Sequence, residues 1–151
     1  IQETRITWTL DVRPCAGTPD VVKPKNGRKR LVELKSCDSS APWHFLYKAE
    51  KMAYHAQVAW YADGLATCTN YEPGPVDEVF VVAVESTAPY PVTVFELDAD
   101  ILADGRQLWR PWFETLLECE RTGKFPAYAE GVQKWSRRDR TDGLDWTTAA
   151  E

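Results

Sequence analysis

The sequence predicts an α+β (mixed α/β) fold with a central mixed sheet flanked by helices. Residues 3–37 contain short β-rich segments separated by turns, residues 38–64 show helical apolar spacing, and residues 76–122 read as two strands and a helix. The 151 residues, 44% hydrophobic and 27% charged, suit one domain with a real core. We expect this domain to span residues 1–136, followed by a polar tail at 137–151.

The N-terminal segments are predicted to form a three-strand meander. Residues 3–10 are rich in Thr and Ile, which favour strands, and residues 11–14 have the composition of a turn. Residues 15–25 are interpreted as the second strand. The pair Asn26-Gly27, which is the strongest short hairpin signal, joins it to a third strand at residues 28–37.

The central segment is interpreted as one long helix, with a break near Lys51 as the alternative. Pro42 suits the first turn of this helix, and Gly64 is expected to end it. Large side chains recur between them at spacings typical of a helix, at Trp43, Tyr47, Tyr54, Val58 and Tyr61.

The C-terminal half predicts two more strands and a long helix. Residues 76–86 form a nearly continuous apolar run, typical of a strand that is buried on both faces. Residues 91–98 alternate and are expected to be the next strand, while residues 98–122 have helical spacing, with Asp98 as a cap and Gly123 as a stop. The tryptophans expected in the core are Trp8, Trp60, Trp109 and Trp112.

Charge and cysteine content narrow the class of protein. A net charge of −5 argues against a dedicated nucleic-acid coat protein, but allows an enzyme that acts on nucleic acid through a local basic patch. The chain has no apolar run that suits a membrane span and no signal-peptide pattern. It opens with Ile1 rather than Met, and we expect an upstream part to be missing. The four cysteines are widely spaced; we expect reduced thiols, and their spacing fits no iron–sulfur pattern.

The Asn26-Gly27 turn places three charged residues together. A two-residue turn that pairs Lys25 with Arg28 also sets Asp20 directly across from Glu33 on the same face of the hairpin. Directly opposed side chains have Cβ atoms about 4.5–5.5 Å apart. Lys35 lies two residues beyond Glu33 and therefore shares that face.

Two carboxylates at that distance repel each other unless a proton or a cation neutralises them. Oxygen ligands on a partly open site suit Mg²⁺, and Mn²⁺ is expected to substitute for it. Lys35 would then stand beside the metal, where an ammonium can orient or deprotonate an attacking water and offset negative charge. The alternative is a cross-strand salt-bridge ladder on a solvated face.

Several other residues are candidates with open alternatives. Glu3 is a possible further metal ligand, or a solvated edge carboxylate. Tyr54 or Trp43 is a candidate for stacking on a base, and both His44 and His55 are expected to be surface or packing residues. The basic residues near the hairpin tip are expected either to contact DNA phosphates or to form a solvated edge: Lys23, Lys25, Arg28, Lys29 and Arg30.

The motif Pro19-Asp20, followed by Glu33-Leu34-Lys35, resembles the signature of the PD-(D/E)xK nuclease superfamily. Residues 54–64 are similar to the helix that follows this motif in the exonuclease VIII (RecE-type) group and in related phage and RecB-type nucleases, where Gln-x-x-x-Tyr recurs. Gln57 and Tyr61 occupy those positions here, and residues 80–98 and 116–131 also resemble later parts of the RecE-type group.

The resemblance implies a restriction-endonuclease-like core and a Mg²⁺-dependent exonuclease that acts on the ends of linear double-stranded DNA. It further implies 5′-end resection for recombination, a single-strand annealing protein as a partner, a homo-oligomer, and a bacterial or phage-encoded protein of the cytoplasm without a membrane role. Asp20 and Glu33 would be metal ligands, together with the Leu34 carbonyl. Lys35 would be the catalytic lysine, and Gln57 and Tyr61 would position the DNA strand or the scissile phosphate.

This sequence departs from the family pattern in two places. Relatives carry Arg or a similar residue before Pro-Asp, where this chain has Thr18. The family also has an acidic or His ligand on an upstream helix, which has no counterpart before Glu3. One alternative is therefore a catalytically inactive nuclease-fold protein that binds DNA or a recombination partner. Another is an unrelated α+β binding domain in which the charged residues form only a salt-bridge ladder.

Overall fold

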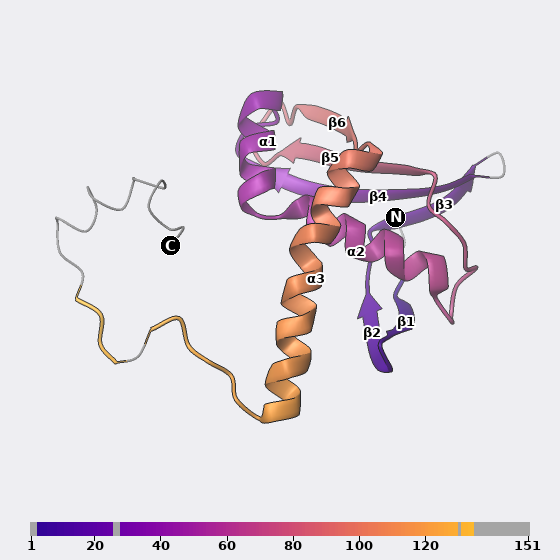
Figure 1. Ribbon diagram of the computed structural model, residues 1–151. Helices are drawn as coiled ribbons and strands as arrows, with labels where there is room; N and C mark the ends of the chain where they lie inside the picture. Colours follow the sequence, from indigo (N-terminus) through magenta and orange to yellow (C-terminus); the bar gives the residue numbers. More distant parts are fainter. Residues whose placement is uncertain (1–2, 26–27, 130, 135–151) are drawn as a thin grey trace. The chain divides into compact units, whose positions relative to one another are not determined.

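The computed structural model describes residues 3–25, 28–129 and 131–134 (Figure 1). The chain divides into a compact unit at 1–116, which holds both sheets and the candidate site, and a unit at 117–151. The expected polar tail at 137–151 lies outside the described residues. None of the described helices is both long enough and apolar enough to cross a bilayer.

The strands form two separate sheets within the first unit. A two-stranded antiparallel sheet consists of β1 (Ile6–Leu10) and β2 (Arg13–Gly17). A four-stranded sheet has the order β3-β4-β5-β6, with β4 and β5 parallel and the other pairs antiparallel. Its strands are β3 (Val21–Lys25), β4 (Arg28–Cys37), β5 (Glu78–Glu85) and β6 (Val92–Glu96). The mixed central sheet is as predicted.

The predicted three-strand meander is wrong, because residues 15–25 do not form one strand. The chain leaves the small sheet after Gly17 and enters the large one at Val21. At the crossing, Pro19 has no N–H to give to a ladder, and its carbonyl accepts the Thr4 N–H at 3.3 Å. The predicted turn after β1 does occur, and Asp11 and Val12 there have positive φ angles of 46° and 62°.

The central segment forms two helices, which confirms the alternative prediction of a break near Lys51. The helices of the described residues are α1 (Pro42–Lys51), α2 (Tyr54–Thr67) and α3 (Ala99–Thr122). Between the first two, Ala53 adopts a left-handed conformation with φ of 52°, which no helix can continue through. Asp98 caps α3 as predicted, because its Oδ1 accepts the Ile101 N–H at 2.9 Å, and Gly123 follows the last turn with φ of 69°.

Gly64 does not end the central helix as predicted, because α2 continues to Thr67. The reason for a glycine there is packing. A Cβ atom at Gly64 would lie 2.8 Å from ring atoms of Trp8, closer than real side chains approach. Gly64 thus lets α2 lie against the β1–β2 sheet.

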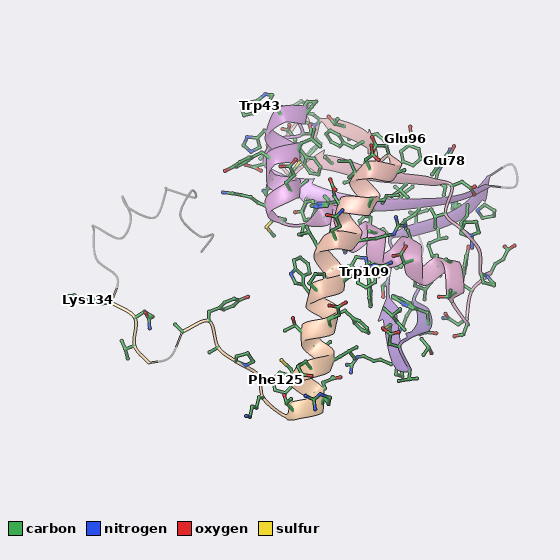
Figure 2. All side chains as sticks on the ribbon, viewed as in Figure 1. Trp43, Glu78, Glu96, Trp109, Phe125 and Lys134 are labelled. Carbon is green, nitrogen blue, oxygen red and sulfur yellow. The ribbon has the colours of Figure 1, made fainter. Side chains whose placement is uncertain are left out.

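The core lies on one face of the four-stranded sheet, beneath α1 and α2. Its buried members include Leu31, Phe45, Val58, Leu65, Val79, Val81 and Ala83. The prediction that β5 is buried on both faces is wrong: alternate residues are buried, while Val82 and Val84 are only partly covered. Beside them on β6, Val92 and Val94 are exposed. Trp112 is also not a core residue, being 57% exposed, whereas Trp8 and Trp109 are buried (Figure 2 labels Trp109).

Candidate active site

Asp20 and Glu33 meet where β3 begins. The pairs Lys25–Arg28 and Val21–Val32 confirm the predicted register, so Asp20, one residue before β3, lies opposite Glu33. The Asp20 N–H points at Glu33 Oε2 at 3.4 Å, and Asp20 Oδ2 accepts the Leu34 N–H at 2.7 Å. On the side of β4 that faces β3, the Leu34 N–H is therefore bound by the Asp20 carboxylate instead of by a backbone carbonyl of a longer β3.

Glu33 is the buried centre of a polar network, with only 4% of its surface exposed. Its Oε1 accepts hydrogen bonds from Lys35 Nζ and from Gln57 Nε2, each at 3.0 Å. Lys35 Nζ also donates to Gln57 Oε1 at 2.7 Å, which fixes the orientation of the amide. The three side chains thus form a closed ring of hydrogen bonds between β4 and α2.

Tyr61 extends the network along α2. Gln57 and Tyr61 are one turn apart, and Gln57 Nε2 donates to the Tyr61 hydroxyl at 3.1 Å. The Tyr61 ring has room because residue 17 is a glycine, where a Cβ atom would lie 2.6 Å from the ring. Gly17 at the end of β2 therefore fixes how closely this face of α2 approaches the strands.

Tyr54, which the sequence indicates as a helix residue and a candidate for base stacking, has its ring against the site lysine. Lys35 Nζ lies 4.9 Å from the ring centroid, within the range of a cation–π interaction. The signal in the sequence was its spacing of three from Gln57, which places both on the same face of α2. The other candidate for stacking, Trp43, is 78% exposed on α1 and contacts His44.

Burial sets the electrostatics of the pair. Loss of solvent raises the pKa of Glu33 above its usual range, while the hydrogen bond and charge of Lys35 act in the opposite direction. The negative charge of Asp20 raises this pKa further. The fold thus holds two carboxylates together at a position where positive charge stabilises their ionised form.

Comparison with known proteins places this arrangement in a family. Residues 2–137 match the family described as "PDDEXK-like domain of unknown function (DUF3799)". The chain belongs to this family. No protein with a curated description matches the sequence.

A solved structure shares this fold. The PDDEXK-like chain resembles the crystal structure named "Putative exonuclease" from Eubacterium rectale, with a TM-score of 0.65 and 13% identity over 95% of this chain and 57% of that one. A weaker likeness, to the crystal structure of SSO0001, has a TM-score of 0.41 and 14% identity over 82% of this chain and 49% of that one. The chain spans about half the length of these two proteins.

PD-(D/E)xK nucleases generally use divalent metals, and the oxygens of this PDDEXK-like chain fit such an ion. Asp20 Oδ1 has no partner among the described residues, and Glu33 Oε2 accepts only the long contact from the Asp20 N–H. The Leu34 carbonyl points to the same strand edge as its N–H, beyond the start of β3. Two carboxylates and a carbonyl suit Mg²⁺, which keeps several waters and shares its coordination with substrate phosphates.

Glu3 does not join the carboxylate pair. The Thr4 N–H bonds to the Pro19 carbonyl, so the backbone passes near Asp20, but the Glu3 side chain is exposed. Within the described part of the chain, no group of three or more His, Cys, Asp or Glu side chains is placed to hold a metal. His44 instead contacts Asp38 at 3.1 Å, away from the site.

The basic residues of the β3–β4 hairpin are distributed over both faces. Strand alternation puts Lys23 and Arg30 on the face opposite Glu33, and Arg30 pairs with Glu78. Lys29 is engaged with the loop before β5, where its Nζ donates to the Glu72 carbonyl at 2.5 Å. The tip residues 26–27, like the side chains of Lys25 and Arg28, lie outside the described part. Phosphate contact by this cluster stays a prediction.

Proposed function

We propose that the protein is a divalent-metal-dependent DNA nuclease, and specifically an exonuclease on linear double-stranded DNA. The observation that carries the proposal is the hydrogen-bonded ring of Glu33, Lys35 and Gln57, with Asp20 set against it by the hairpin register. Membership of the PDDEXK-like family and the fold shared with a protein named as an exonuclease support a nuclease.

The geometry supports a role for each residue in this proposal. Asp20, Glu33 and the Leu34 carbonyl would hold Mg²⁺, or Mn²⁺ in its place, and the bound ion supplies a Lewis acid and a water of lowered pKa. Lys35 Nζ lies 3.0 Å from Glu33 Oε1, so its ammonium would stand beside the ion that these carboxylates would hold, where it would orient the attacking water and offset phosphate charge. Gln57 holds Lys35 in place and is itself bonded to Tyr61, and both α2 side chains would present polar groups to the DNA strand.

The finer function rests on the resemblance of the motif and helix to the RecE-type group. We propose that the enzyme resects 5′ ends to leave a 3′ single strand for recombination. A single-strand annealing protein would then bind the 3′ single strand, in the cytoplasm of a bacterium or of a phage-infected cell. Oligomers are a further proposal, because processive relatives assemble as rings.

The test of this proposal uses linear and closed circular duplex DNA, labelled in separate samples at the 5′ or the 3′ end of the linear form. The wild type should degrade only linear DNA, release the 5′ label first, and stop when EDTA removes the metal. Lys51→Ala is a suitable control for the Lys35→Ala variant, since Lys51 is exposed at the end of α1. Cutting of the circular form would show an endonuclease, and cutting in EDTA would contradict metal dependence.

A second candidate function is a nuclease-fold protein that binds DNA without cutting it. The observation in its favour is that only Asp20 and Glu33 contribute carboxylates at the site among the described residues. This candidate predicts DNA binding without cleavage in either Mg²⁺ or Mn²⁺. The same assay, run beside a gel-shift measurement on the intact protein, separates the two candidates.

A further inference from the structure

A groove separate from the carboxylate pair lies between α1, α2, β6 and the first half of α3. Its volume is about 570 Å³, which falls within the range of binding sites for small ligands and side chains. Apolar residues from these elements line it, among them Leu46, Ala49, Phe95, Leu97, Ile101 and Leu108. All belong to the unit at 1–116.

The floor of the groove is aromatic, and its rims are exposed. Phe45 is buried and stacks on Phe95, with ring centroids 5.0 Å apart and planes at 14°. On the two rims, Leu46 of α1 is 47% exposed and Ile101 of α3 is 43% exposed. Large aliphatic side chains left open over an aromatic floor are typical of surfaces that bind another apolar group.

The carboxylates of the groove give it an acidic character. Glu50, Glu96 and Asp104 line it, and among the described residues its other polar side chains are those of Tyr54 and His55 (Figure 2 labels Glu96). In the described part of the chain, neither Lys nor Arg lines the groove, and none forms an ion pair with these three carboxylates. Such a surface repels the phosphates of DNA and favours positively charged groups.

We propose that this groove binds an amphipathic, basic peptide segment of a partner protein. Leu, Ile or Phe side chains of the segment would lie on Phe45 and Phe95, and its Lys or Arg side chains would pair with Glu50, Glu96 and Asp104. A helix with apolar anchors at spacings of three and four suits a groove bounded by helices. The acidic net charge of this chain disfavours a second copy of itself as the occupant.

The groove and the candidate active site share one residue. Tyr54 lines the groove, and its ring also contacts Lys35. The remaining members of the polar network, including Gln57, do not line the groove. Binding at the groove can therefore be measured independently of DNA cleavage, and the proposal does not rest on nuclease activity.

The test is the binding of labelled synthetic peptides to the full chain, measured by fluorescence anisotropy at physiological salt. The probe carries Leu at helical spacing and Lys elsewhere. One comparison peptide replaces Lys by Glu, and another replaces Leu by Ser. Only the Leu/Lys peptide should bind. Binding of all three peptides alike, or of none, would overturn the proposal.

Matched variants locate the binding. The double variant Glu50→Lys with Asp104→Lys should weaken Leu/Lys binding by about tenfold, since two favourable charge contacts become repulsive. Glu114→Lys, the same change at an exposed position outside the groove, should alter it by less than about twofold. Equal weakening by both would indicate attraction to the net charge alone and overturn the proposal.

A second measurement does not depend on any variant folding. On addition of the Leu/Lys peptide, the changes in methyl chemical shift of the wild type should be largest at Ala49, Ile101 and Leu108. The exposed valines of the outer sheet face, Val92 and Val94, are the internal control, because they offer apolar surface without lining the groove. Shifts confined to these valines would contradict the proposal.

Discussion

Gln57 Oε1 accepts a hydrogen bond from Lys35 Nζ at 2.7 Å, while Nε2 of the same amide donates to Glu33. One side chain from α2 therefore fixes both the ammonium and the carboxylate of β4. An amide can do this because it carries an acceptor and a donor on one rigid group. The relationship gives Gln57 a positioning role that can be measured.

Replacing Gln57 should lower activity without removing the site. In Gln57→Ala, Lys35 and Glu33 each lose a partner, and we expect cleavage or metal affinity to fall about 10–100-fold, as for other residues that orient metal ligands. Single-turnover cleavage and Mn²⁺ titration would measure the two effects. His55→Ala, on the same helix but outside the network, should behave as wild type. Unchanged kinetics in Gln57→Ala would contradict the positioning role.

The ring of Tyr54 should matter more than its hydroxyl. Its contact with Lys35 Nζ is made by the ring, so Tyr54→Phe should retain wild-type cleavage. Tyr54→Leu removes the π face, and a cation–π interaction of about 0.5–2 kcal/mol predicts a slower rate by roughly 2–30-fold. Cleavage rates of the two variants at saturating metal provide the comparison. Equal loss in both variants would show that the hydroxyl, and not the ring, is required.

Two helical glycines should resist replacement to different extents. A Cβ atom at Gly105 would lie 2.4 Å from the His55 carbonyl oxygen of α2, whereas at Gly64 it would meet the ring of Trp8. Backbone yields less than a side chain, so Gly105→Ala should cost more stability than Gly64→Ala, with overpacking typically costing about 1–3 kcal/mol. Urea unfolding of both variants measures this order. A gain in stability, the usual result of Gly→Ala in an open helix, would contradict the packing.

The contribution of Asp38 should depend on pH. Hydrogen bonds from Lys48 Nζ at 2.9 Å and from His44 lower the pKa of this exposed carboxyl well below its usual value of 3.8. A lowered pKa stabilises the fold above that usual value, and the stabilisation is lost as the pH falls further. Tm should therefore be higher for wild type than for Asp38→Asn at neutral pH, and the difference should shrink in acid. A difference that grows in acid would contradict this sign.

The sequence predicted which of these side chains lie together better than it predicted the architecture around them. The Asn26-Gly27 turn determines the register locally, so Asp20 could be placed opposite Glu33 by counting, and the helix period placed Gln57 near Tyr61. The separation of β2 from β3 was not predictable, because it depends on which sheet each strand joins. The role of Gly64 likewise depends on the distant Trp8 ring, and no local pattern signals such a contact.

The most direct test of the central claim measures Mn²⁺ affinity and DNA cleavage in wild type, Glu33→Gln and Lys35→Ala. Glu33→Gln should lose both, because the buried carboxylate oxygens would hold the ion. Lys35→Ala should still bind Mn²⁺ but fail to cleave, because the lysine acts on the water and the phosphate. Glu33→Gln that binds Mn²⁺ and cuts DNA like wild type would contradict the assignment of this site.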